Sequence, residues 1–172
     1  IWGTLDPFHA PGDYLGRSVA NSEFLHALLR RDPFAEYHFF LGDRQLTAWL
    51  EQALTQEYGT DFVNDKVRIR TRLALPEALA SHEYACFHLS DCIHTPPHLA
   101  WARNRYAKNL FPITGVTHSL SYSRYGAAFA AHLWPGMTPR DVVVATSRSG
   151  AEVVRQYYAQ AREGYGPGLE AL

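Results

Sequence analysis

The sequence predicts an α/β protein, a Rossmann-like three-layer α/β/α sandwich with a mostly parallel sheet. Short apolar segments alternate with helical patterns along all 172 residues, which is the order that successive βαβ units produce. The later apolar segments are continuous runs of β-branched residues, as expected of strands with both faces covered. The length suits one domain with a core of its own, so we interpret residues 1–172 as a single domain.

In the first half of the chain, the spacing of apolar residues and the proline and glycine residues that end helices define the elements. Apolar residues at three- and four-residue spacing predict a helix that Asp32-Pro33 ends and a second helix that Gly59 follows. Arg68, Arg70 and Arg72 alternate with apolar residues, which favours a solvated edge strand over a phosphate-binding stripe. The expected elements are strand 1–6, loop 7–16, helix 17–31, strand 36–41, helix 44–58 and strand 66–75.

The second half continues the alternation. Pro96-Pro97 suits the first turn of a helix, and Asp141-Val-Val-Val-Ala-Thr146 is the most apolar strand. Gly164-Tyr-Gly-Pro-Gly168 is the one segment expected to be flexible. The expected elements are a helical turn 76–81, strand 84–89, helix 96–106, strand 111–117, helix 125–134, strand 141–146 and helix 151–162.

Composition and charge exclude several classes of protein. The 16 basic and 17 acidic side chains give a net charge of −1, without the basic excess of a nucleic-acid binder. A hydrophobic share of 47% argues against disorder, and no stretch reaches the ~20 apolar residues of a membrane helix. Two cysteines make no disulfide framework. We expect a cytoplasmic protein, free or peripheral at the inner membrane. Because the sequence begins at Ile1 instead of Met, we expect that the chain was trimmed, processed or cut from a longer polypeptide.

Candidate site residues follow the expected strands, because ligands of an open parallel sheet bind beyond the carboxyl ends of its strands. Polar and titratable side chains concentrate in those segments, which indicates a site. The segments are 6–17, Asp43, 90–98, 118–122 and 147–150.

The first of these segments contains Gly12 and Asp13 and ends at Gly16 and Arg17, where a helix is expected to begin. Backbone N–H groups of a glycine-containing turn at a helix N-terminus can bind an anion. The spacing matches neither G-x-G-x-x-G nor a P-loop. An anion or sugar site and a plain surface loop both remain open.

A second group consists of Cys86, His88, Cys92, His94 and His98. A structural zinc site needs four converging ligands, and this spacing lacks the usual paired pattern. We therefore expect no metal ion and no cofactor. Cys86 and His88 are expected to point into the layer beside the sheet, and His94 and His98 to line the mouth of a cleft.

His118 follows directly after an apolar strand, between Thr117 and Ser119. A histidine at a strand end can bond a substrate hydroxyl or carry a partial positive charge, and a structural hydrogen bond is the alternative. Ser147 also follows a strand, but it does not belong to a G-x-S-x-G elbow. Ser149-Gly150 is interpreted as the N-cap of the last helix.

Two segments of the chain resemble a known family. Phe111-Pro-Ile-Thr-Gly-Val-Thr-His118-Ser-Leu-Ser-Tyr122, then a helix, then Asp141-Val-Val-Val-Ala-Thr-Ser147-Arg-Ser-Gly-Ala-Glu-Val-Val154 are similar to the N-terminal domain of GT-B glycosyltransferases of the retaining family-4 type, also called glycosyl transferase group 1. Asp91-Cys-Ile-His94 resembles the strand end that precedes them there. The likeness covers about residues 84–158 by motif. The family's first loop often carries Gly-Gly, whereas this chain has Pro11-Gly12-Asp13.

The resemblance implies the acceptor-side half of an enzyme that transfers a sugar from a nucleotide-sugar donor to a glycan, lipid or small-molecule acceptor, without a metal ion. His118 would be the catalytic residue that approaches the donor sugar, and the transition state would resemble an oxocarbenium ion. The residues implied to bind substrate are Gly12, Asp13, Gly16, Arg17, His94, Ser119 and Ser147.

The C-terminal half of such an enzyme carries an E-x7-E motif, and no two glutamates of this sequence stand eight positions apart. We therefore expect that the nucleotide-sugar domain is absent from this chain and that the 172 residues are inactive alone. Two other functions remain open. One is a nucleotide-sugar 2-epimerase of the same architecture, and the other is a non-catalytic α/β domain that binds a small ligand or partner.

Overall fold

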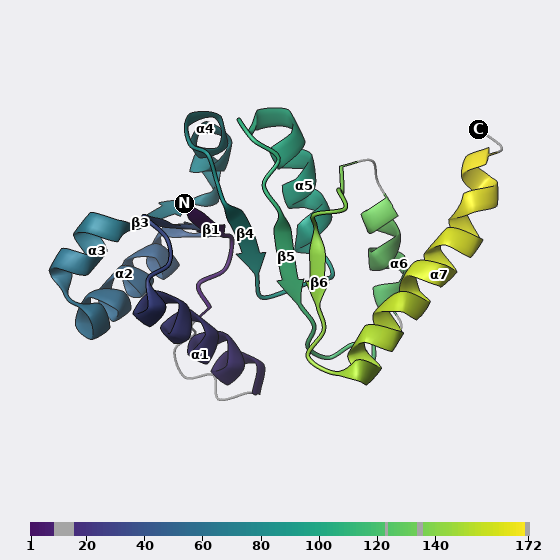
Figure 1. The fold of residues 1–172 in the computed structure, drawn as a ribbon, viewed down its shortest axis with the longest axis horizontal. Helices are drawn as coiled ribbons and strands as arrows, with labels where there is room; N and C mark the ends of the chain where they lie inside the picture. The colour runs from purple at the N-terminus through teal and green to yellow at the C-terminus, as the bar shows by residue number, and fades with distance from the viewer. Residues whose placement is uncertain (9–15, 123, 134–135, 171–172) are drawn as a thin grey trace.

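Six parallel strands form one sheet in the computed structural model, which describes residues 1–8, 16–122, 124–133 and 136–170, with side chains to residue 164 (Figure 1). The strand order is β3-β2-β1-β4-β5-β6, and each neighbouring pair is parallel. The predicted α/β class and parallel sheet are thus confirmed. The strands are β1 (Trp2–Thr4), β2 (Tyr37–Leu41), β3 (Val67–Thr71), β4 (Cys86–Leu89), β5 (Ile113–Val116) and β6 (Val142–Val144).

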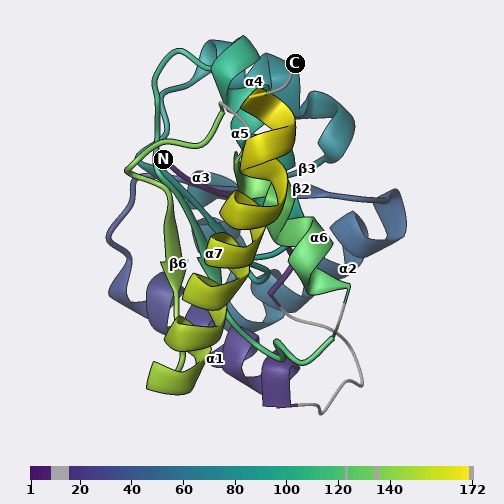
Figure 2. The ribbon, with the colours of Figure 1, turned by 90° about the vertical axis from the view of Figure 1, so that its right-hand side faces the viewer.

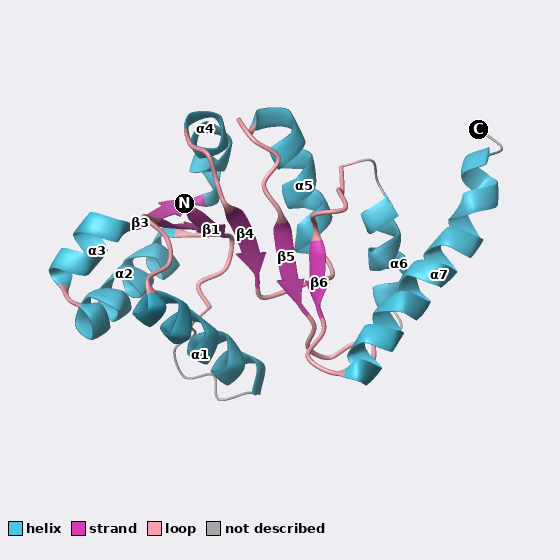
Figure 3. Ribbon diagram, viewed as in Figure 1, coloured by secondary structure: helices cyan, strands magenta, loops and turns pink. Residues whose placement is uncertain are grey.

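Helices cover both faces of the sheet, and the two halves of the chain supply different faces (Figure 3). Those between β1 and β3 pack on one face, where Leu25 meets Tyr37 and Phe39 of β2. The later helices lie on the other face, where Leu99 packs with Phe87 and Ile113. The helices are α1 (Gly16–Arg31), α2 (Arg44–Tyr58), α3 (Thr60–Lys66), α4 (Leu75–Ser81), α5 (Thr95–Tyr106), α6 (Tyr125–Ala130) and α7 (Arg148–Glu170), with 3-10 turns at Arg72–Ala74 and Ala131–Leu133. None of the described helices is long and apolar enough to cross a bilayer.

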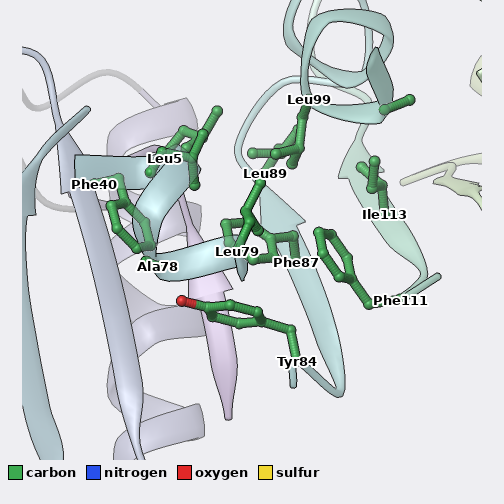
Figure 4. Close-up of a cluster of buried hydrophobic side chains, with 12 residues drawn as sticks. Leu5, Phe40, Ala78, Leu79, Tyr84, Phe87, Leu89, Leu99, Phe111 and Ile113 are labelled. Carbon is green, nitrogen blue, oxygen red and sulfur yellow. The ribbon is translucent and has the colours of Figure 1, made fainter. Parts of the chain in front are cut away.

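Aromatic side chains fill the core on the α4 and α5 side of the sheet (Figure 4). The Phe87 ring stacks on Phe40 and on Phe111, with centroids 6.2 Å and 4.8 Å apart. Gly3 of β1 makes room for this ring, because a Cβ at that position would lie 2.4 Å from it. The central strand of the sheet therefore needs glycine where the largest core side chains meet.

Several element boundaries differ from the sequence prediction. The predicted strand 66–75 ends at Thr71, and Arg72 turns back so that its Nη2 donates to the Leu5 carbonyl at 3.0 Å. The predicted helix 125–134 becomes the 3-10 turn Ala131–Leu133 after Ala130. The short helix α3 was missed, because seven residues with one buried side chain, Val63, show no helical period.

The last helix differs most from its prediction. It begins at Arg148 instead of residue 151 and continues to Glu170. The segment 164–168, predicted to be flexible, is therefore helical. Glycine lowers helix propensity by about 1 kcal/mol per residue, which weakens a helix without ending it.

The prediction that both faces of the later strands are covered is wrong for β6. Val142 and Val144 remain 48% and 43% exposed at the edge of the sheet. Figure 2 shows α5, α6 and α7 together on one side of β6, and in Figure 1 no helix lies in front of β5 and β6. The valine run therefore belongs to an edge strand with one open face.

Candidate functional site

The strand order places the topological switch between β1 and β4, because the chain turns to one side after β1 and to the other after β4. Ligands of doubly wound sheets bind at such a point. The ends of the two strands are joined directly: the Ser90 backbone N–H donates to Asp6 Oδ2 at 2.8 Å. Asp6 is held in turn by its own N–H, which donates to Thr4 Oγ1 at 3.1 Å.

Arg17 reaches this point from the first turn of α1. Its Nη2 donates to Ser90 Oγ at 3.3 Å, while the side chain as a whole stays exposed. Ser90 itself is buried. One guanidinium edge is therefore fixed to the end of β4, and the rest of the group has no other partner among the described residues. We call the group formed by Asp6, Arg17, Ser90 and His118 the β1–β4 junction.

His118 joins the junction from the end of β5. Its ring lies near the backbone carbonyl of Ser90, and its Nε2 atom is buried and has no partner in the described part of the chain. Burial lowers the pKa of His118 and the Arg17 charge lowers it further, against the opposing effects of the Ser90 carbonyl and Asp91. The ring is therefore neutral near pH 7, and one of its two nitrogens carries a lone pair that can accept a hydrogen bond.

Two threonines fix the strand end that carries His118. Thr117 Oγ1 accepts a hydrogen bond from the Thr146 backbone N–H at 2.9 Å, and the two threonine hydroxyls lie 3.1 Å apart. Gly115 lets the strand pass close to the end of β4, since a Cβ there would lie 2.7 Å from the Asp91 carbonyl. His118 is thus positioned by the contacts that Thr117 and Gly115 of its own strand end make with the ends of β6 and β4.

Two helices begin next to the junction, and each is capped by a side chain. Asp91 accepts from the backbone N–H groups of Ile93 and His94 at 2.9 and 2.8 Å, at the start of α5. Ser147 Oγ accepts from the Gly150 N–H at 2.9 Å at the start of α7. The predicted cap Ser149-Gly150 is therefore wrong by two residues, because Ser149 already lies inside the helix.

The structure brings only part of the predicted substrate-binding set together. Gly16 begins α1 with open space around its Cα, so no close approach requires a glycine there. Gly12 and Asp13 lie outside the described residues. His94 is exposed and its ring packs edge-on against Tyr125, with centroids 5.8 Å apart. Ser119 is exposed next to His118, and Ser147 is used as a helix cap.

Cys86 and His88 point into the helical layer beside the sheet, as predicted, and Cys86 packs against the apolar cluster under α1 and α2. His88 is buried below α1, where its ring lies against those of Phe8 and Phe24 and its Nδ1 is 2.6 Å from Thr114 Oγ1. Burial lowers the pKa of His88 to about 4. Within the described residues, no three His, Cys, Asp or Glu side chains stand close enough together to hold a metal ion.

The contacts of Asp6 and Ser90 are the part of the site that the sequence could not supply. Both residues lie in segments that follow expected strands, which was the available signal. Asp6 contacts Ser90, which is 84 positions further along the chain. Ser90 also contacts Arg17, which lies 73 positions before it. Only the pairing of β1 with β4 brings these positions together.

Comparison with known proteins identifies no relative of this chain. No family model, no curated protein and no solved structure matches the chain. The chemistry of the β1–β4 junction is therefore the basis for assigning a function.

Proposed function

We propose that this chain is the acceptor-side half of a GT-B glycosyltransferase and that the β1–β4 junction faces the sugar that is transferred. The observation that carries the proposal is the neutral His118 ring, whose buried Nε2 has no partner among the described residues, beside the Arg17 charge. A sugar hydroxyl can form a hydrogen bond with this nitrogen if the side chains that bury it move aside on binding, and a phosphate oxygen can accept from the exposed arginine. The likeness of residues 84–158 to the retaining family-4 enzymes supports the same assignment.

The reaction breaks the bond between the anomeric carbon and the donor phosphate oxygen, the oxygen of the acceptor hydroxyl bonds to that carbon, and the hydroxyl proton passes to the leaving phosphate. Positive charge develops on the sugar ring, and negative charge on the leaving nucleoside diphosphate. A neutral His118 suits this change, since an imidazolium next to the ring would repel the developing positive charge. Arg17, fixed to Ser90 at 3.3 Å, would stabilise the leaving phosphate.

The test uses the natural polypeptide that contains this chain, incubated with UDP-, GDP- and ADP-linked hexoses in the presence and absence of sugar and lipid acceptors. Release of nucleoside diphosphate is measured. We expect one donor to be consumed, faster with an acceptor, and His118→Ala to lower kcat by about 100-fold or more. Arg17→Ala should lower kcat as well, because the leaving phosphate loses its cation.

His82→Ala is the matched control, since this ring packs against His38 at the opposite ends of the strands, with centroids 5.2 Å apart. It should leave turnover unchanged. A folded His118→Ala protein with unaltered kcat would refute the catalytic role. Conversion of UDP-GlcNAc to an epimer without an acceptor would indicate the 2-epimerase instead. Binding of donors or sugars without any turnover would indicate a non-catalytic domain.

A further inference from the structure

A pocket of about 300 Å³ lies behind β5 and β6, under the helices that cover this face of the sheet. Its apolar wall includes Ile113 of β5, Val143 of β6 and Met137 of the segment between α6 and β6. Small-molecule sites are concave, mostly apolar and begin at roughly this volume. The pocket is distinct from the β1–β4 junction, because Ile113 and Val143 point away from the face on which α1 packs.

The polar side of the pocket presents a hydrogen-bond acceptor. His132 is buried, and its Nε2 donates to the Ile93 carbonyl at 2.8 Å. Burial lowers the pKa of His132, so the ring is neutral and Nδ1 accepts a hydrogen bond. Tyr158 OH lies 3.1 Å from this Nδ1 and donates to it. The tyrosine proton is therefore used, and the lone pairs of its oxygen remain for a donor on a ligand.

No uncompensated charge faces the pocket from its described lining. The Asp141 carboxylate accepts from Arg103 Nη1 at 2.6 Å and Nη2 at 3.0 Å, and from the backbone N–H groups of Ile113 and Thr138. Burial raises the pKa of the Cys92 thiol to about 12, which keeps it uncharged. An ionised ligand would lose its hydration here without gaining a partner of opposite charge.

We propose that this pocket binds an uncharged, mostly apolar molecule about the size of a substituted benzene ring, through one hydroxyl or amide N–H that donates to the Tyr158 oxygen. The proposal goes beyond glycosyl transfer and does not depend on it. A phenol or a small alcohol has the required chemistry. An ether of the same shape lacks the donor, and a carboxylate adds a charge that nothing in the described lining pairs with.

Three matched probes test this on the 172-residue chain: p-cresol, 4-methylanisole and p-toluate. Binding is followed by 1H–15N NMR at Gly115 and Val143. We expect p-cresol to bind with a Kd of roughly 0.1–1 mM, as its size allows. The ether should bind about 10-fold more weakly, and p-toluate should cause no shift of these signals.

Two variants identify the contact. Tyr158→Phe should weaken p-cresol about 5- to 10-fold and leave 4-methylanisole unchanged, because it removes the acceptor oxygen together with its hydrogen bond to His132 Nδ1. Tyr157→Phe is the control, since its hydroxyl donates to the Leu120 carbonyl at 2.8 Å, outside the pocket. Val143→Phe should fill the pocket, so that neither p-cresol nor 4-methylanisole shifts the Gly115 signal. Four results would each overturn the proposal. They are equal binding of p-cresol and p-toluate, p-cresol shifts at residues outside the pocket instead of at Gly115 and Val143, no binding of p-cresol at about 10 mM, and unaltered affinity for p-cresol in Tyr158→Phe.

Discussion

The protonation states of individual histidines follow from their burial. His118 at the β1–β4 junction is neutral because its ring is desolvated and lies beside Arg17. His38, in β2, is only 1% exposed, with Nδ1 2.9 Å from Tyr84 OH and Nε2 3.0 Å from Glu36 Oε2. Nε2 of the first histidine is buried and has no partner among the described residues, whereas both nitrogens of the second are bonded inside the protein.

Protonation of His38 should make the protein less stable in mild acid. Burial lowers its pKa from 6.5 to about 4, although Glu36 acts in the opposite direction, and the charges of His82 and Arg70 add to the lowering. Between these two pH values the unfolded chain binds more protons, so the free energy of unfolding falls as the pH drops from 6.5 to about 4. The loss at the lower limit is about 3 kcal/mol.

Urea unfolding between pH 7 and roughly pH 4.5 measures this effect. His38→Gln should reduce the pH dependence over this window, whatever its effect at pH 7. The slope that remains contains the contribution of His88, whose pKa is also lowered to about 4 by burial. An unchanged slope in the variant would show that His38 is not the group that titrates.

At the scale of elements, one buried ion pair joins α5 to the strands behind it. Arg103 of α5 and Asp141 before β6 are 1% exposed or less at their side chains, and Nη1 lies 2.6 Å from Oδ1. Arg103 also donates to the carbonyls of Phe111 and Gly136 at 2.7 and 2.8 Å. Burial by itself raises the pKa of Asp141, but hydrogen bonds from Arg103, Thr138 and Ile113 bring it below its usual value.

Breaking this pair should be costly. Arg103→Met leaves the Asp141 carboxylate buried without its cation, which we expect to lower the free energy of unfolding by about 3–5 kcal/mol. Arg105→Met, on the exposed side of the same helix, removes only a guanidinium that lies 5.7 Å from the Trp101 ring centroid, and should cost less than about 1 kcal/mol. Denaturant unfolding of both variants measures the two losses in free energy of unfolding. Equal losses would contradict a special role for the buried pair.

At the scale of the whole molecule, the strand order sets both the site and the open face. The connections from β1 to β3 run toward one edge and those from β4 to β6 toward the other. Because parallel crossovers are right-handed, the helices of the two halves lie on opposite faces. This places the β1–β4 junction at the centre of the sheet and leaves the α1 side of β6 without a covering helix among the described residues (Figure 1).

The open face predicts a mild response to substitution. Changing Val142 and Val144 to Thr together should cost less than about 1 kcal/mol, because these side chains remain 48% and 43% exposed. Ile113→Thr on the neighbouring strand, where the side chain is 1% exposed, should cost about 2–4 kcal/mol. Urea unfolding compares the two variants. A loss in the double variant as large as that of Ile113→Thr would mean that the face is covered in solution.

The sequence by itself determined the alternation of strands and helices, the parallel sheet and the segments whose ends meet at the β1–β4 junction. These depend on hydrophobic period and on turn residues, which are local properties. His118 could be singled out because it directly follows an apolar strand. Where the local signal was weak, as in α3, or misleading, as in the glycines of α7, the prediction failed.

The tertiary structure alone decided which strand ends meet. Asp6, Arg17 and His118 converge on Ser90 only because β4 pairs with β1 on one side and β5 on the other. It also decided that Val142 and Val144 face outward, since an edge strand and a central strand share the same apolar pattern. Strand order is set by packing between segments far apart in sequence, and no local pattern encodes it.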